Sequence, residues 1–227
     1  MNERVIIITG GNGGIGLESV KQFLTDNYVV IAISKSTDNL LTIHNQRLEV
    51  FACDVCDYQK LKLIFEQVLS KYQRIDGVIN NAGVVFSGEF LDMSHTDIQK
   101  MIDVNIKGLT NVLELVIPVM RQKKSGTIIN ISSLADRNVR PLTAVYAATK
   151  AYVKSISDSL RMANAKYNIR ITSISPASVK TPMLDKLRPH DDVIAVEQFV
   201  KVLKFIYEQP QEISIRDMVI APTSYES

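Results

Sequence analysis

The sequence of residues 5–16 is VIIITGGNGGIG, and it decides the fold of the chain. Its Val/Ile run predicts a strand buried on both faces, as in a parallel sheet. The five glycines that follow allow positive φ angles and a close approach of backbone to a ligand. A helix beginning near Ile15 would direct its unpaired N–H groups at that ligand. The stretch therefore predicts a dinucleotide site, with a ligand-free glycine turn as the alternative.

Length and charge narrow the class of protein. At 227 residues the chain suits one well-buried domain, and we expect residues 1–227 to form a single domain. A net charge of +2 gives no reason to expect a nucleic acid or membrane partner. Residues 1–4 lead into the first strand without a signal peptide, and apolar runs such as 29–33 are too short to span a bilayer. We therefore expect a cytoplasmic location.

Cys53 and Cys56 form a C-x-x-C pair at the predicted end of a strand. Redox pairs of this type usually open a helix, and Asp54 between the two has another expected role. We expect two free thiols and no metal site, with a redox or metal role as the alternative.

Alternating strand and helix patterns run along the whole chain. Apolar runs predict strands over residues 5–9, 28–33, 48–53, 76–80, 126–131, 169–174 and 218–220. Helical spacing predicts helices over residues 15–25, 38–46 (short and weak), 58–72, 94–121, 143–165 and 196–208. Pro118 predicts a kink or an early stop in the fourth of these helices. The expected fold class is α/β, a Rossmann-type domain with a doubly wound, mostly parallel, seven-stranded sheet.

The residues after the second strand bear on cofactor choice. An acidic residue there would bind the ribose hydroxyls of NAD, whereas a basic one suits the 2′-phosphate of NADP. Ser34 and Lys35 stand at this point with no carboxylate beside them. They favour NADP, and the alternatives are a solvated loop lysine and an NAD-linked enzyme.

Tyr146 and Lys150 are four residues apart and share one face of a predicted helix. An ammonium beside a phenol stabilises phenolate, so we expect Lys150 to lower the pKa of Tyr146. Such a tyrosine can exchange a proton with the oxygen of a carbonyl/alcohol pair during hydride transfer to or from a nicotinamide. Ser133, after the fifth strand, can hold the same oxygen by a hydrogen bond.

Together these motifs resemble the short-chain dehydrogenase/reductase family over essentially the whole chain. Thr9-Gly10-x-x-x-Gly14-Ile15-Gly16 is similar to the family's cofactor turn, Cys53-Asp54-Val55 to its adenine-contacting segment, and Asn80-Asn81-Ala82-Gly83 to the motif that braces its sheet. Residues 176–183, PASVKTPM, resemble the segment that meets the nicotinamide carboxamide.

The resemblance implies roles for individual residues. Tyr146 would be the general acid/base, Lys150 would hold the nicotinamide ribose, Ser133 would orient the substrate oxygen, and Asn105 would support a proton-relaying water. The implied cofactor-binding residues are Gly10, Asn12, Gly14, Ile15, Gly16, Ser34, Lys35, Asp54, Val55, Asn81, Ala82, Gly83, Tyr146, Lys150, Pro176, Val179 and Thr181.

Several positions depart from the family pattern. Ala177 and Asp136 stand where the family commonly has glycine, and Gly13 stands where many NADP-using members have a basic residue. The charged segment between Met183 and Val196 is short for a substrate lid, which suggests an open pocket.

A weaker resemblance, in residues 208–223, connects the chain to the NADP-dependent 3-hydroxy acid (serine) dehydrogenase branch. Arg137 or Arg140 could then bind a substrate carboxylate, with two solvated arginines as the alternative. The expected reaction is hydride transfer between NAD(P) and a small polar alcohol or carbonyl compound, 3-hydroxy acids included. The alternative function is a dinucleotide-binding regulator or scaffold of the same fold.

Family members usually pair through the helices that carry the asparagine and the tyrosine. Beyond the catalytic pair, the second of these helices has the apolar residues Val153, Ile156, Leu160 and Met162. These exceed what one helix needs to pack on its own sheet, so we expect a homodimer or homotetramer.

Overall fold

The computed structural model of the chain describes residues 3–185 and 192–225. Its strands are β1 (Arg4–Thr9), β2 (Tyr28–Ser34), β3 (Leu48–Ala52), β4 (Gly77–Asn80), β5 (Gly126–Ile131), β6 (Ile169–Pro176) and β7 (Asp217–Ile220). Its helices are α1 (Gly14–Thr25), α2 (Tyr58–Tyr72), α3 (His95–Ile102), α4 (Leu109–Lys123), α5 (Ala144–Asn164), α6 (Pro182–Asp185) and α7 (Val196–Glu208). The predicted lid falls mainly on residues 186–191, outside the described residues.

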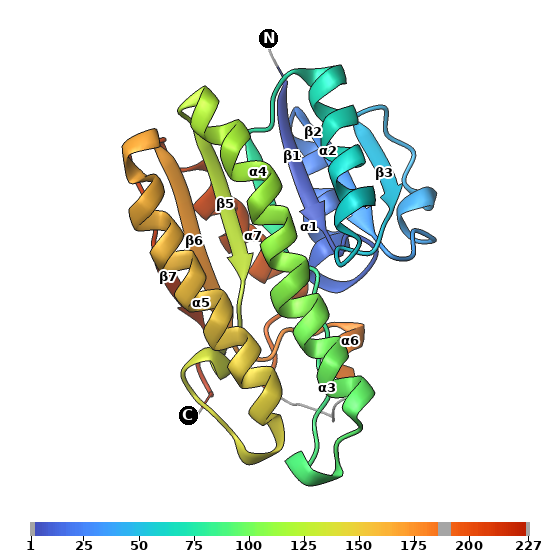
Figure 1. Cartoon of the computed structure of the whole chain (residues 1–227), viewed down its shortest axis with the longest axis vertical. Coiled ribbons are helices and arrows are strands. Elements are labelled where there is room, and N and C mark those ends of the chain that lie inside the picture. Colours follow the sequence, from blue (N-terminus) through green and yellow to red (C-terminus); the bar gives the residue numbers. More distant parts are fainter. Residues whose placement is uncertain (1–2, 186–191, 226–227) are drawn as a thin grey trace.

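The strands form one seven-stranded sheet in the order β3-β2-β1-β4-β5-β6-β7. Every pairing is parallel, so the prediction of a doubly wound, seven-stranded sheet is confirmed. Helices α2, α4 and α5 cover one face, and α1 and α7 lie on the other (Figure 1). The helices on the two faces are needed because parallel strands bury apolar side chains on both sides.

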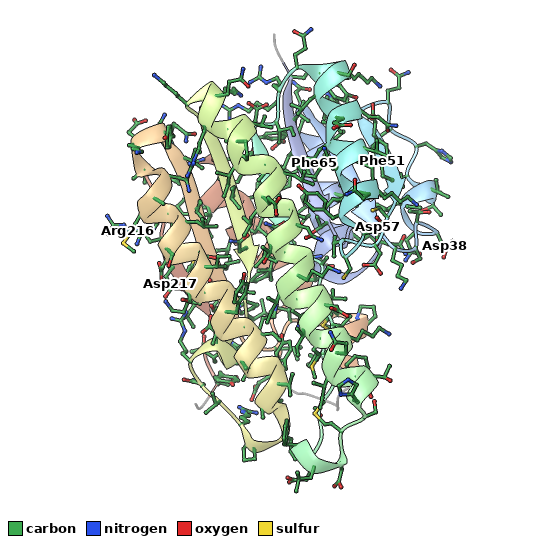
Figure 2. All side chains as sticks on the ribbon, in the orientation of Figure 1. Asp38, Phe51, Asp57, Phe65, Arg216 and Asp217 are labelled. Carbon is green, nitrogen blue, oxygen red and sulfur yellow. The ribbon has the colours of Figure 1, made fainter. Side chains whose placement is uncertain are left out.

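Two apolar clusters fill the space between the sheet and its helices. Under α2, α4 and α5, the cluster includes Phe65 with Phe51 of β3 packed against it (Figure 2). Under α1 and α7, Phe23, Tyr28 and Tyr207 meet edge to face with ring centroids 5.2–5.7 Å apart. Among the described helices, none is long and apolar enough to cross a membrane.

Two sequence-based expectations about helices were wrong, and of the two outcomes expected at Pro118 the early stop does not occur. Residues 38–46 contain only a 3-10 turn, Leu40–Thr42, because Asn39 and Leu40 donate to the Asn12 side chain rather than start a longer helix. The helix predicted over residues 94–121 is divided by a π-helical turn, Asp103–Gly108. Pro118 does not end α4, which continues to Lys123 with the proline ring on its exposed side.

The apolar residues expected to form an interface on α5 are largely used within the chain. Val153 is buried, and Ile156 and Leu160 pack against the same core. Only Met162 is mainly exposed, at 64%. The sequence argument for excess apolar surface on this helix therefore does not hold, because α5 uses these residues to pack on its own sheet.

Candidate active site

The candidate site lies at the carboxyl ends of the central strands. The order β2-β1-β4-β5 means that the chain moves outward in opposite directions from β1 and β4, and ligands bind in the crevice at such a switch point. Thr9 ends β1, Asn80 ends β4, Ile131 ends β5 and Pro176 ends β6. The residues that follow these strand ends are those singled out from the sequence.

The glycine turn has the geometry that a dinucleotide requires. Gly10 and Gly14 have φ angles of 65° and 49°, which side chains rarely adopt. A β-carbon at Gly16 would lie 2.1 Å from the Gly10 carbonyl oxygen, so only glycine fits there. Around Gly13 there is open space, with nothing within 4 Å of such a β-carbon. The turn, the start of α1 at Gly14 and the open side at Gly13 together fit a bound pyrophosphate.

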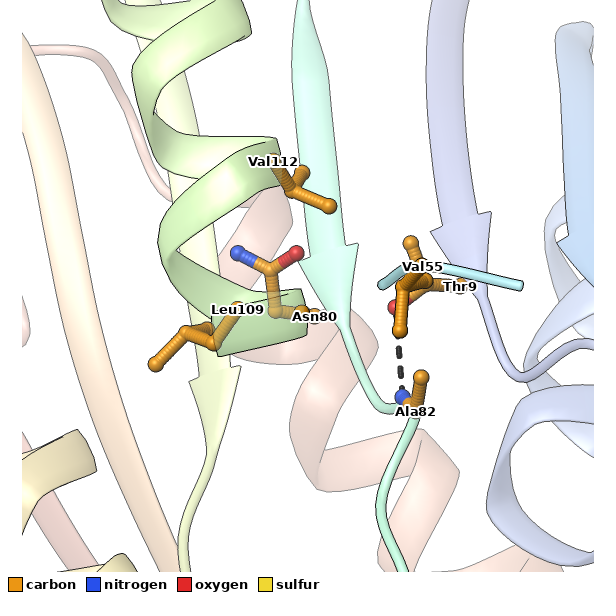
Figure 3. Close-up of a pocket in the computed structure, with 7 residues that line it drawn as sticks. Thr9, Val55, Asn80, Ala82, Leu109 and Val112 are labelled. Atoms are coloured by element: carbon orange, nitrogen blue, oxygen red, sulfur yellow. Dashed lines mark hydrogen bonds between the residues drawn. The ribbon is translucent and has the colours of Figure 1, made fainter. Parts of the chain in front are cut away.

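Thr9 and Asn81 join the two central strands below this turn. The Thr9 hydroxyl accepts hydrogen bonds from the backbone N–H groups of Asn81 and Ala82, the second at 3.2 Å (Figure 3). The Asn81 side chain donates to the carbonyls of Thr9 and Gly10, both at 3.1 Å. These bonds fix the distance between the glycine turn and residues 81–83, the two predicted walls of the cofactor site.

A small cavity of about 10 Å³ lies behind this junction, between the two strand ends and α4. Its lining includes Thr9, Val55, Asn80, Leu109 and Val112, and the Asn80 side chain lies between the last two (Figure 3). Asn80 donates to Asn130 Oδ1, and Asn130 donates to Ser157. Among the described residues no group donates to Asn80 Oδ1, and the cavity has room for about one water beside it.

The predicted adenosine end of the site is formed by the loop after β2. Asn12 accepts from the backbone of Asn39 and donates to the Ser36 hydroxyl, so its side chain holds this loop against the glycine turn. Lys35 is 79% exposed and pairs with Asp54 at 3.2 Å. Asp54 Oδ1 also accepts from the Cys56 N–H, and these bonds lower the pKa of its carboxyl despite partial burial.

Residues 176–181 close the other side of the predicted site. Ser178 and Lys180 pair with the backbone of Ile194, and Val179 is buried between them. A β-carbon at Gly14 would lie 3.1 Å from Thr181 Cγ2, so Thr181 lies directly over the glycine turn.

The π-helical turn between α3 and α4 places Asn105 inside the molecule. The Asn105 side chain accepts from the Val84 N–H at 2.8 Å and donates to the Val84 carbonyl at 2.9 Å. It also donates to the Thr149 hydroxyl on α5 at 3.0 Å. π-helical turns of this kind occur often at functional sites, because they redirect a side chain from the helix surface.

Asn105 and Lys150 meet at Gly83. A β-carbon at Gly83 would lie 3.3 Å from Asn105 Oδ1 and 3.8 Å from Lys150 Nζ. Lys150 Nζ donates to the Ile131 carbonyl at 2.9 Å and lies 5.7 Å from the centre of the Tyr146 ring. Burial lowers the pKa of Lys150 to about 8, against a smaller opposing effect of the Asp136 charge.

The expectation that Lys150 lowers the pKa of Tyr146 is not met. Burial of its hydroxyl raises this pKa above the ordinary value, although a hydrogen bond with Ser133 acts in the opposite sense. The physical reason is that Lys150 is directed at the Ile131 carbonyl and is itself disfavoured as an ammonium by burial.

The two arginines considered for a substrate carboxylate differ in availability. Arg137 donates to both carboxyl oxygens of Asp217 at 2.9 Å and to Asp136 at 2.6 Å, so its donors are used within the chain. Arg140 is exposed, and among the described side chains it donates to the Tyr225 hydroxyl, at 2.9 Å. Only Arg140 remains a candidate.

Three residues of this region carry contacts that the sequence did not reveal. Thr149 links Asn105 to the backbone of Tyr146, Asp136 accepts from Ser132 and Ser175, and Thr9 joins β1 to β4. Thr149 could have been suspected, since it lies three residues from Tyr146 on the same helix. Cys53 and Cys56 are free, as expected, and burial raises their pKa values to about 11 and about 12.

Comparison with known proteins identifies the family of the chain. The family profile described as short chain dehydrogenase matches residues 4–192. An uncharacterized oxidoreductase of Staphylococcus saprophyticus is 31% identical over 99% of this chain and 98% of its own length. The 3-oxoacyl-[acyl-carrier-protein] reductase of Thermotoga maritima is 33% identical over 81% of this chain and 77% of its own. The crystal structure of serine dehydrogenase from Escherichia coli superposes with a TM-score of 0.89 at 25% identity, covering 98% and 100% of the two chains.

The chain belongs to the short-chain dehydrogenase family. It is an NAD(P)-dependent oxidoreductase of the type that this family comprises.

Proposed function

We propose that the chain transfers hydride between NADP and a small polar alcohol or carbonyl compound, with residues 1–227 acting as one dinucleotide-binding and catalytic domain. The observation that carries the proposal is the convergence of Asn105, Ser133, Tyr146 and Lys150 beside a glycine turn that fits a pyrophosphate. A dinucleotide-binding regulator would not need all four of these side chains.

The proposed roles follow from the surroundings of each side chain. When bound, the nicotinamide would supply or accept the hydride. Tyr146 would give a proton to the substrate oxygen during reduction and, as phenolate, would take one from it during oxidation, with Ser133 orienting that oxygen. Lys150 would hold the nicotinamide ribose through its ammonium. Asn105 would support a water that relays the proton, because its hydrogen bonds hold the Val84 backbone and the Thr149 hydroxyl in place.

NADP is favoured over NAD by the loop after β2. No carboxylate occurs among residues 34–37, and Lys35 presents an ammonium there. Its ion pair with Asp54 is mainly exposed, and such pairs contribute little to stability. Lys35 can therefore leave Asp54 for a 2′-phosphate at small cost.

The substrate class is a small polar alcohol or its carbonyl counterpart, with 3-hydroxy acids as the leading candidates. Arg140 is the exposed cation that could bind their carboxylate. The resemblance to serine dehydrogenase supports this class, and the resemblance to a 3-oxoacyl reductase supports 3-oxo compounds.

Replacing Tyr146 with Phe tests the proposal. The ring and its packing remain, but the proton donor is lost, so kcat should fall by about 10²–10⁴-fold while NADP still binds. The measurement is nicotinamide absorbance with a panel of 3-hydroxy acids, aldehydes, diketones and 3-oxoacyl thioesters. Near-normal turnover of the variant would refute the role of Tyr146. Cofactor binding without turnover of any substrate by the unmodified protein would favour a regulator.

A further inference from the structure

Asp136 is a fully buried carboxylate three residues after Ser133. Its side chain has no exposed surface. One carboxyl oxygen accepts from the Ser132 hydroxyl at 2.8 Å and the Ser175 hydroxyl at 2.5 Å, and the other accepts from Arg137 Nε at 2.6 Å. All of these contacts are hydrogen bonds donated to the carboxyl group, and the one from the guanidinium is charge-assisted.

These contacts connect the carboxyl ends of β5 and β6 with the first residue of β7. Ser132 directly follows β5, and Ser175 is the penultimate residue of β6. Arg137 continues the network to Asp217, which begins β7. Ser132 precedes the proposed substrate-orienting Ser133, and Ser175 precedes Pro176, where the proposed nicotinamide segment begins. Asp136 therefore sets the distance between the two sides of the reaction site.

The charge of this carboxylate also acts on the proposed proton donor, Tyr146. Arg137 faces it from its own turn, Asp217 lies beyond Arg137 on β7, and β6 offers only the Ser175 hydroxyl. On α5, the Asp136 charge acts on Tyr146 and Lys150. Lys154 of the same helix forms an ion pair with Asp217 at 3.6 Å. Ser132, which donates to Asp136, also lies 3.2 Å from the Lys150 carbonyl.

We propose that Asp136 is a positioning residue for the reaction: through Ser132 and Ser175 it holds Ser133 and the Pro176 segment at their working distance, and its negative charge acts on Tyr146 and Lys150. The inference rests on the proposed function. A buried carboxylate destabilises the fold unless it is fully paired, and a glycine at this position would avoid that cost. The three donors around Asp136 meet the requirement for pairing.

The Asp136 charge shifts the pKa values of its neighbours in a direction that can be measured. A negative charge disfavours phenolate and favours ammonium, so Asp136 raises the pKa of both Tyr146 and Lys150. Replacing Asp136 with Asn preserves shape and removes the charge. Both pKa values should then fall.

The experiment compares kcat and its pH profile in the unmodified protein, Asp136→Asn and Asp158→Asn. Asp158 is a carboxylate on the exposed side of α5 that contacts Lys154 and Arg161, and it serves as the matched control. In the plot of kcat against pH for alcohol oxidation, we expect the rising part of the curve to lie at lower pH in the Asp136→Asn variant, by roughly half a pH unit or more. The kcat of this variant should fall about tenfold, with the KM for the cofactor changed by less than about twofold. The control should keep the unmodified profile.

Ser175→Ala separates the two effects, because it removes one contact and keeps the charge. Ser175→Ala should lower kcat without shifting the curve of kcat against pH. It also tests the positioning role if Asp136→Asn does not fold. Unchanged kcat and pH profile in Asp136→Asn, or unchanged kcat in Ser175→Ala, would overturn the proposal.

A titration without substrate distinguishes failure of this inference from failure of the proposed function. Tyrosinate absorbance is followed against pH with and without Tyr146→Phe, in the unmodified and Asp136→Asn backgrounds, and the difference isolates Tyr146. A lower pKa of Tyr146 in the Asp136→Asn background supports the effect of the charge even if no substrate is turned over. An unchanged pKa refutes it.

Discussion

Lys35 is the single residue on which the choice of cofactor depends. An ammonium and a 2′-phosphate form charge-assisted hydrogen bonds, whereas NAD offers no phosphate at this point. Lys35→Ala should therefore weaken NADP by roughly ten- to a hundredfold and leave NAD nearly unchanged. Ser34→Asp should act in the opposite sense, because a carboxylate repels the phosphate and accepts from ribose hydroxyls.

The measurement is kcat/KM for both cofactors in the unmodified protein and the two variants. A preference of the unmodified protein for NAD, or an equal loss for both cofactors in Lys35→Ala, would show that Lys35 is only a solvated loop residue.

Lys150 makes the stability of the fold depend on pH. Its pKa falls from an ordinary value of 10.5 to about 8 on folding, so the unfolded chain binds more protons between these values. Stability therefore rises with pH across that window. Lys150→Met removes the effect, and the difference in unfolding free energy between the two proteins should change by on the order of 2 kcal/mol from pH 8 to 10.5.

Urea titrations of both proteins at several pH values measure this difference. A constant difference across the window would mean that Lys150 is not destabilised as an ammonium in the folded protein.

At the scale of elements, the end of α7 and the connection to β7 depend on one buried cation. Arg170 of β6 donates to the carbonyls of Tyr207 and Gln209 at 2.7 and 2.6 Å, and to the Thr127 hydroxyl. These carbonyls have no further helical partner, since α7 ends at Glu208. Arg170 thus acts as a cap inserted from the neighbouring strand.

Arg170→Met should lower the free energy of unfolding by about 2 kcal/mol or more, because buried carbonyls lose their donors. Hydrogen exchange should also quicken in residues 207–217. Arg216→Met, a change of the same kind at an exposed position just before β7, is the control (Figure 2). Equal effects of the two changes would contradict the capping role.

The π-helical turn at Asp103–Gly108 is a second element whose conformation depends on contacts with distant segments. Residues 94–121 show uninterrupted helical spacing, so no local pattern revealed the turn. A β-carbon at Gly108 would lie 2.4 Å from Val55 Cγ2, and Asn105 binds the backbone at Val84. The turn is stabilised by these contacts between segments distant in sequence.

For the whole molecule, the homo-oligomer remains a prediction. It rests on family membership, since most apolar residues of α5 pack within the chain. Light scattering at micromolar concentration should give the mass of a dimer or tetramer. A monomeric mass of about 25.4 kDa would refute it.

The sequence alone determined the sheet, and it supplied the site residues that the proposed function uses. Val/Ile runs, five glycines and period-3.6 helices are local signals, and the topology rules for parallel sheets then leave few arrangements. The glycine turn, Gly83 and Ser133 follow β1, β4 and β5, and the carboxyl ends of parallel strands share one edge, so strand order brings these residues together.

Only the tertiary structure decided how those residues are held and charged. The burial that raises the pKa of Tyr146 and the use of Arg137 by Asp136 and Asp217 depend on which side chains meet across strands. The same is true of Asp136, which from sequence is only a departure from glycine. Desolvation and pairing are properties of three-dimensional neighbours, and Asp136 and Asp217 are 81 positions apart in the chain.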